Sequence, residues 1–236
     1  MKTILIVGSS GGLGTALTDF FIQQKCQLVL HFYTKRPEVQ ESENTMLISA
    51  NIADEDEVKS MMKSISDRFG KLDIVINNAG VSISEISWKT KLSNWDKTIA
   101  VNLTGPFLVS KYAVPIMKSS SWGRIIFISS IVAQTGFVGT SAYAASKAGL
   151  LGLTKSLAKE VAPKGITVNA IALGYFNVGM IADVPDVLKA NIVESIPNKA
   201  LGDPKQLFET IQFIISENSD YLTGQTINLN GGLYMA

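Results

Sequence analysis

Two side chains four residues apart, Tyr143 and Lys147, have the types and spacing for proton transfer. They fall in a run, 142–157, that is rich in helix formers and has no proline. Four helical steps of about 100° leave the two side chains about 40° apart on one helix face. An ammonium held about 4–6 Å from a phenol favours the phenolate and lowers its pKa from about 10. We therefore expect Tyr143 to exchange a proton near neutral pH, although such a pair alone also occurs on ordinary surface helices.

Two further polar residues extend this candidate catalytic group. Ser130 follows an expected buried strand, 124–128, and so lies at its carboxyl end. Asn102 lies inside an expected long helix, 93–117, where Pro106 and Pro115 predict a kink or bulge. In isolation, an asparagine in a helix is more often an exposed or backbone-bonded residue.

A glycine-rich turn follows the first expected strand, 3–7, and precedes an expected helix, 13–24. A helix N-terminus offers free N–H groups and the positive end of a dipole, and glycines let a pyrophosphate approach the backbone. The turn therefore predicts cofactor contacts, although a purely structural turn is the alternative. The candidate residues are Gly8, Ser9, Ser10, Gly11, Gly12, Leu13 and Gly14.

The end of the second expected strand, 27–33, bears on the choice of dinucleotide. An acidic residue there would bond the ribose hydroxyls, but this segment carries Tyr33, Lys35 and Arg36 and no acid. The two bases favour a 2′-phosphate, and hence NADP(H) over NAD(H). A solvated basic loop is the alternative.

Strands and helices alternate along the rest of the chain. This alternation predicts a single-domain α/β fold over 1–236, with a doubly wound, Rossmann-like parallel sheet of about seven strands and helices on both faces. A shortened connection is expected over 34–44, a helix over 55–69 capped by Asp54, and a substrate lid over 175–201. Further strands are expected at 45–50, 72–76, 166–172 and 226–229, and further helices at 185–195 and 204–217.

Ligands of such sheets bind outside the carboxyl ends of the strands. The expected strand ends add further candidate cofactor contacts to the glycine turn. They are Asn51, Ile52, Asn78, Ala79, Gly80, Gly174 and Phe176.

Composition excludes several other classes of protein. The chain has 236 residues, 46% hydrophobic and 17% charged, with a formal net charge of +1, which gives no general attraction to nucleic acid or membrane. One cysteine and one histidine cannot form a disulfide framework or a His/Cys zinc site, so we expect no metal. The apolar run before Gly8 is too short for a signal peptide, and we expect a cytoplasmic protein.

The order and spacing of these motifs resemble the short-chain dehydrogenase/reductase family over essentially the whole chain, and most closely its 3-oxoacyl-[acyl-carrier-protein] reductases. The family motifs are Gly8-x-x-x-Gly12-x-Gly14, Asn77-Asn78-Ala79-Gly80, Asn102, Ser130 and Tyr143-x-x-x-Lys147. The closer likeness is carried by Arg124-Ile125-Ile126, by the segment from Tyr143 to Gly149, and by the ending Asn230-Gly231-Gly232-Leu233-Tyr234-Met235.

The resemblance implies a role for each catalytic candidate. Tyr143 would donate a proton to the carbonyl oxygen, and Lys147 would lower the Tyr143 pKa and bond the nicotinamide ribose. Ser130 would orient the carbonyl, and Asn102 would hold a water that links the lysine to solvent. The implied reaction is reduction of a 3-oxoacyl thioester, linked to acyl carrier protein or CoA, in fatty acid biosynthesis. Alternatives are an alcohol or secondary-metabolite dehydrogenase that oxidises another hydroxyl substrate or reduces another ketone, or a non-catalytic dinucleotide sensor.

The sequence also differs from the family pattern in several places. Val7 replaces a usual Thr, and Gly11 stands where NADPH-dependent members often carry a base. Leu173 replaces a Pro and Val178 a Thr. The turn 119–122 lacks the docking bases of the carrier-protein enzymes, although Lys118, Arg124 and Lys164 remain nearby.

We also expect a homotetramer. Small residues line the active-site helix, apolar residues exceed one stripe on the 93–117 helix, and the C-terminus is apolar. The small residues are Ala144, Ala145, Ala148, Gly149 and Gly152, and the additional apolar residues are Ile99, Phe107, Leu108 and Val109. A monomer whose helices simply pack on the sheet is the alternative.

Overall fold

Seven parallel strands form the central sheet, in the order β3-β2-β1-β4-β5-β6-β7. The structure, a computed structural model, describes residues 1–182 and 184–235. The strand order runs outward in both directions from the neighbours β1 and β4, which places the topological switch point between them. The strands are β1 (Lys2–Val7), β2 (Cys26–Phe32), β3 (Thr45–Ser49), β4 (Ile74–Asn77), β5 (Gly123–Ser130), β6 (Ile166–Leu173) and β7 (Thr226–Leu229).

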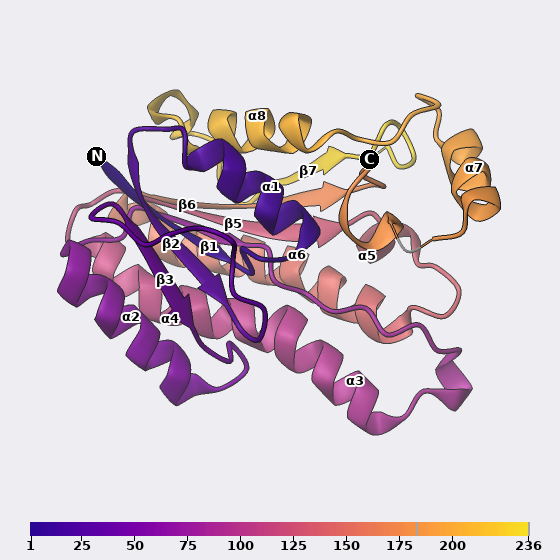
Figure 1. Ribbon diagram of the computed structural model, residues 1–236, viewed down its shortest axis with the longest axis horizontal. Helices are drawn as coiled ribbons and strands as arrows, with labels where there is room; N and C mark the ends of the chain where they lie inside the picture. The colour runs from indigo at the N-terminus through magenta and orange to yellow at the C-terminus, as the bar shows by residue number, and fades with distance from the viewer. Residues whose placement is uncertain (183, 236) are drawn as a thin grey trace.

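Helices cover both faces of the sheet (Figure 1). Helices α1 (Gly12–Phe21) and α8 (Pro204–Ile215) lie on one face, and α2 (Glu55–Phe69), α4 (Gly105–Lys118) and α6 (Ser141–Val161) lie on the other. The remaining α-helices are α3 (Leu92–Ile99), α5 (Val132–Thr135) and α7 (Asp186–Ser195). Short helical turns occur at η1 (Ser87–Lys89), η2 (Ala100–Thr104), η3 (Ala162–Lys164), η4 (Gly179–Ile181) and η5 (Glu217–Ser219).

The alternation of side chains along β1 shows how the two apolar layers form. Leu5 and Val7 point into the layer beneath α2, α4 and α6, whereas Ile4 and Ile6 point into the layer beneath α1 and α8. All four side chains are buried, and each contributes about 1.5–3 kcal/mol when taken fully out of water. The doubly wound α/β fold expected from the sequence is therefore confirmed.

Most expected elements occur with small shifts at their ends. Helix α2 has the expected bounds, and the Asp54 carboxylate accepts hydrogen bonds from the N–H groups of Asp56 and Glu57. Helix α1 ends at Phe21, earlier than expected, and β4 begins at Ile74 rather than at residue 72. The connection between β2 and β3 is shortened, as expected for 34–44, and the structure has no helix there.

The expected long helix is interrupted, as its prolines predicted. Pro106 has no N–H to donate to the carbonyl of Asn102, four residues earlier, so the α-helical bonding pattern cannot continue there. The chain forms the π-helical turn η2 at this place, between α3 and α4.

The continuous helical segment Leu92–Lys118 is long and apolar enough to cross a membrane, but the core helix of a globular domain passes the same test. Within the domain, 39% of its most apolar window is buried. Its parts pack against α2, α6 and β5.

Candidate active site

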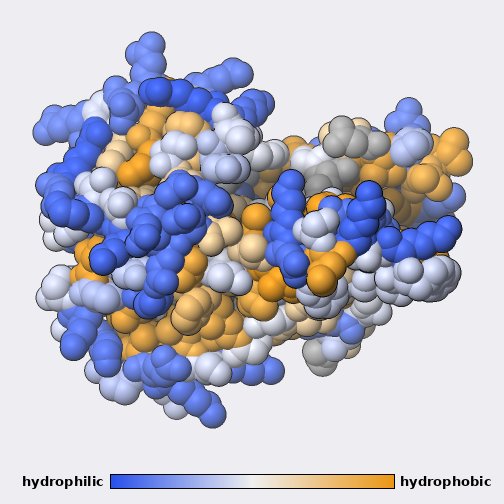
Figure 2. All heavy atoms as spheres, turned by 90° about the horizontal axis from the view of Figure 1, so that it is seen from below, coloured by the Kyte–Doolittle hydropathy of each residue, from blue (hydrophilic) through white to orange (hydrophobic). Residues whose placement is uncertain are grey.

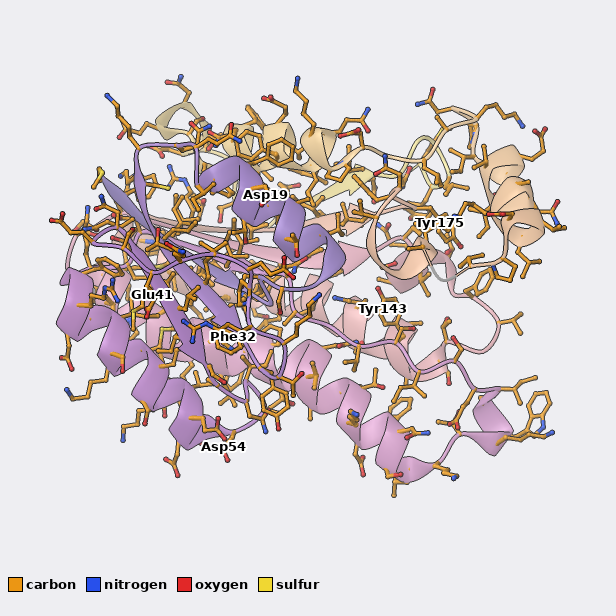
Figure 3. The ribbon with its side chains drawn as sticks, viewed as in Figure 1. Asp19, Phe32, Glu41, Asp54, Tyr143 and Tyr175 are labelled. Carbon is orange, nitrogen blue, oxygen red and sulfur yellow. The ribbon has the colours of Figure 1, made fainter. Side chains whose placement is uncertain are left out.

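The four catalytic candidates meet at the carboxyl end of the sheet. Ser130 is the last residue of β5, Tyr143 and Lys147 lie on the first turns of α6, and Asn102 lies in η2. Figure 3 shows Tyr143 at this end of the molecule, together with Tyr175 of the expected lid. The exposed fractions are 8% for Ser130, 8% for Tyr143, 4% for Lys147 and 0% for Asn102, so the group is shielded from bulk water.

Asn102 joins three elements through its side chain. Its Oδ1 accepts from the Val81 N–H at 2.8 Å, and its Nδ2 donates to the Val81 carbonyl at 2.8 Å. The same Nδ2 donates to Ser146 Oγ at 3.1 Å, and that hydroxyl donates to the Tyr143 carbonyl at 2.7 Å. Asn102 therefore fixes the loop after β4 against the helix that carries Tyr143.

Lys147 is held by the backbone of β5. Its Nζ donates to the Ile128 carbonyl at 2.8 Å, and Ser129 Oγ donates to the Lys147 carbonyl at 3.0 Å. Burial lowers the pKa of Lys147 from 10.5 to about 8. At pH 7 the ammonium form still predominates, by about ten to one.

The expected lowering of the Tyr143 pKa by Lys147 is wrong for this structure. Burial raises the pKa of Tyr143, and a hydrogen bond with the Ser130 side chain acts in the opposite, weaker direction. The Lys147 ammonium lies 5.7 Å from the centre of the Tyr143 ring and bonds a backbone carbonyl instead of the phenol. Helical spacing placed the two residues on one face, but it could not show which acceptor the lysine would choose.

The glycine turn between β1 and α1 has the close backbone packing that a phosphate-binding turn needs. Gly8 has φ +77°, and a Cβ there would lie 2.7 Å from Ala79 Cα. A Cβ on Gly14 would lie 2.0 Å from the Gly8 carbonyl oxygen, which accepts a hydrogen bond from Asn78 Nδ2 at 2.9 Å. These residues fit a dinucleotide, because only glycine leaves the helix N-terminus open to a pyrophosphate.

The expected lid reaches this turn. A Cβ on Gly12 would lie 2.5 Å from the backbone of Gly179, so the two glycines pack backbone to backbone. Gly179 has φ +75°, a conformation that glycine adopts without strain. The turn η4 thus lies over the first residue of α1, where Ser9 is buried and Ser10, Gly11 and Leu13 are at least partly exposed.

The other expected cofactor contacts lie after the carboxyl ends of β2, β3, β4 and β6. Tyr33, Lys35 and Arg36 are exposed beyond the end of β2. Asn51 donates its N–H to the Glu57 carboxylate at 2.6 Å, and Ile52 packs against Gly105.

Gly80 lies beside both Asn102 and Lys147, whereas Gly174 packs against Asn230. Phe176 is 5% exposed, and its ring packs against Gly202, so the side chain belongs to the core. Any contact that Phe176 makes with a cofactor would be through its backbone.

Sequence reasoning missed several supporting groups. Ser129, Ser146 and the Ile128 carbonyl orient the catalytic residues, and His31 bonds the glycine turn. The position of Ser146 one residue before Lys147 was the available signal for it. The role of a carbonyl in β5 had no signal in the sequence.

Comparison with known proteins identifies the family of this chain. A family model described as Enoyl-(Acyl carrier protein) reductase matches residues 7–234. The chain is 36% identical over 242 residues to the 3-oxoacyl-[acyl-carrier-protein] reductase FabG of Staphylococcus aureus, covering 99% of this chain and 98% of that protein. It is 33% identical over 239 residues to the FabG of Vibrio cholerae, covering 99% and 98% of the two chains. It is 35% identical over 240 residues to nodulation protein G of Azospirillum brasilense, covering 98% of each. The chain therefore belongs to the short-chain dehydrogenase/reductase family and is an NAD(P)-dependent oxidoreductase.

Proposed function

We propose that this enzyme is an NADPH-dependent ketoreductase that converts a 3-oxoacyl thioester to the 3-hydroxyacyl thioester. The observation that carries the proposal is the buried group of Ser130, Tyr143 and Lys147 at the carboxyl end of the sheet. The names of the similar FabG proteins support the choice of substrate class. The cofactor, when bound, supplies the hydride.

The residues of the chain supply orientation and a proton. Ser130 Oγ accepts the Val132 N–H at 3.2 Å, and its O–H, which is hydrogen-bonded with Tyr143, would turn to the carbonyl oxygen of a bound substrate and polarise it. Tyr143 donates its phenolic proton to that oxygen as negative charge develops there. Because burial raises the pKa of Tyr143, its phenol is protonated at neutral pH and has a proton to donate. Lys147 places positive charge near the tyrosine ring as long as its side chain is protonated.

Assays of turnover distinguish this function from its alternatives. Acetoacetyl-CoA, the same acyl group on acyl carrier protein, an unrelated ketone and a 2-enoyl thioester are offered with NADPH and with NADH. The enoyl arm is included because the matching family model carries an enoyl reductase description. We expect the 3-oxoacyl thioesters to be reduced fastest. Faster reduction of the ketone or the enoyl thioester would contradict the proposed substrate, and binding without any turnover would favour the sensor.

The preference for NADPH rests on Lys35 and Arg36. Both are exposed next to the end of β2, and within residues 1–182 and 184–235 neither forms a salt bridge. Two unpaired cations can bond a 2′-phosphate with charge-assisted hydrogen bonds. The double substitution Lys35→Ala/Arg36→Ala should weaken NADPH binding and leave NADH binding unchanged. A tighter wild-type constant for NADH would contradict the assignment.

A carrier-protein substrate is supported less directly. Arg124, one of the three bases near the 119–122 turn, is 1% exposed and pairs with Asp220 while its guanidinium stacks on Trp122 at 4.2 Å. It is therefore a structural residue and does not present a docking charge. Lys118 and Lys164 are left as candidate docking bases, and Lys118→Ala/Lys164→Ala should raise KM for the carrier-linked substrate alone.

A cytoplasmic homotetramer remains our proposal for the assembly. Leu108 and Val109 are buried in the core, and a Cβ on Gly149 would meet Leu103, so these residues serve packing within the chain. Phe107, at 47% exposed, and Trp95, at 37%, remain for an interface on the side of α3 and α4. Figure 2, which views the molecule from below, shows hydrophobic areas in orange between hydrophilic residues in blue. Light scattering tests this proposal. A mass near 25.4 kDa, that of a single chain, would show a monomer and contradict it.

A further inference from the structure

The sole histidine of the chain is buried between two candidate cofactor-binding segments. His31 lies near the end of β2 and is 2% exposed. It is the register partner of Val7 in β1 and of Ile48 in β3. The glycine turn follows the first of these strands, and the Asn51–Ile52 corner follows the second.

Both ring nitrogens of His31 have backbone partners. Nδ1 accepts a hydrogen bond from the Gly8 N–H at 3.1 Å, and Nε2 lies 2.9 Å from the Ala50 carbonyl oxygen. Because Nδ1 is an acceptor, the imidazole is neutral and its proton is on Nε2. The ring therefore spans from the first residue of the glycine turn to the residue before Asn51.

The backbone of the same residue holds the turn as well. The His31 carbonyl accepts from the N–H of Gly8 at 3.1 Å, from the N–H of Ser9 at 2.8 Å and from Ser9 Oγ at 2.9 Å. Gly8 thus shares its N–H between the carbonyl and the ring of His31. Since Gly8 has φ +77° and packs on Ala79, its position determines where the rest of the turn can go.

We propose that neutral His31 is a positioning residue that fixes the glycine turn and the Asn51–Ile52 corner for dinucleotide binding, and that its protonation weakens binding. A proton on Nδ1 would place an N–H against the N–H of Gly8, and the hydrogen bond would become a repulsive contact. The proposal rests on the dinucleotide being held at this turn.

In the part of the chain that the structure describes, the hydrogen-bond partners of the His31 ring are backbone groups and not charged side chains. Glu57 of α2 bonds the Asn51 N–H, and Lys35 and Arg36 are exposed beyond β2; none of these bonds the imidazole. Asn77, in register with Val7 on the other side of β1, is uncharged. Burial lowers the pKa of His31, whereas its hydrogen bond with Ala50 has a smaller effect in the other direction. The neutral ring is therefore the form present at neutral pH, and acidification is the perturbation that tests it.

The test uses titration calorimetry with oxidised cofactor, so that no turnover is involved. NADP⁺ and NAD⁺ are each titrated at pH 7.5 and at pH 5.0 into the wild type, His31→Gln and His31→Leu. NAD⁺ is needed because the 2′-phosphate of NADP⁺ itself titrates near pH 6. Cys26→Ala, at the opposite end of β2, is the control for general weakening of the strand.

At pH 7.5 we expect His31→Leu to bind both cofactors roughly five- to tenfold more weakly, the scale of one or two lost hydrogen bonds. Glutamine can accept and donate but cannot titrate, so His31→Gln should bind better than His31→Leu and lose less affinity at pH 5.0 than the wild type does. Equal acid sensitivity of wild type and His31→Gln with NAD⁺, or unchanged affinity in His31→Leu, would overturn the inference. If His31→Leu does not fold, the His31→Gln comparison decides. Absence of binding to the wild type would overturn both this inference and the proposed function.

Discussion

Burial of the Lys147 ammonium should make the stability of this enzyme rise in alkaline solution. The pKa of Lys147 is about 8 in the folded protein, against 10.5 for an ordinary lysine. Below pH 8 both folded and unfolded chains carry the proton, so the penalty for burying the charge is present in full. Between pH 8 and 10.5 the folded chain loses the proton first, the unfolded chain binds more protons, and stability increases with pH.

The size of the effect follows from the difference between the two pKa values. The two pKa values differ by about 2.5, which at about 1.4 kcal/mol per pKa unit corresponds to roughly 3.5 kcal/mol in full, of which roughly 3 kcal/mol falls between pH 7.5 and 10.5. Lys147→Met removes the charge and keeps most of the side-chain volume. The free energy of unfolding of the wild type, minus that of Lys147→Met, should therefore rise by roughly 3 kcal/mol from pH 7.5 to pH 10.5.

Denaturant unfolding at fixed protein concentration measures this difference. The two chains share all other titrating groups, so their contributions cancel in the subtraction. Lys155→Met, an exposed lysine on the same helix, is the matched control. A difference that stays constant within about 1 kcal/mol over this range would refute the reasoning, because burial would then not lower the pKa of Lys147.

Three other changes test separate parts of the site. Tyr143→Phe should lower kcat by about 10²–10⁴-fold and leave the cofactor dissociation constant unchanged, since only the phenolic proton is lost; turnover within a few-fold of wild type would exclude Tyr143 as the acid. Gly12→Ala should weaken cofactor binding, because the new Cβ would lie 2.5 Å from Gly179. Gly152→Ala is the control and should not weaken it, because no atom lies within 4 Å of its Cβ. Equal effects of the two substitutions on binding would contradict the backbone contact. Asp54→Ala should cost about 0.5–2 kcal/mol in thermal or denaturant unfolding through loss of the α2 cap, and no change would mean that water replaces it.

Local rules were sufficient for most of the fold. The Asp54 cap, the continuous apolar strands and the shortened connection over 34–44 each follow from residues close together in the sequence, and the structure contains all three. The interruption near Asn102 was also predictable, because a proline four residues later removes a specific hydrogen-bond donor. These features depend on neighbours within one turn or one strand.

The expectations that failed depend on contacts between distant segments. Tyr143 and Lys147 share a face, but the lysine bonds the carbonyl of Ile128, which lies 19 residues away in the chain. The sequence places Arg124 as a base near the 119–122 turn. In the structure it is buried against Trp122 and pairs with Asp220, 96 residues away. No pattern in either segment carries that information.

If His31 and Lys147 have the proposed roles, these two buried bases should limit activity from opposite sides of neutrality. Lys147 is charged below about pH 8 and loses its proton above it. His31 is neutral at neutral pH, because burial lowers its pKa, and gains a proton only on acidification. Charged Lys147 is the form that places positive charge beside Tyr143, and neutral His31 is the form that accepts the Gly8 N–H. Only the interval between the two titrations provides both forms, so the acid limit should appear in cofactor affinity and the alkaline limit in turnover.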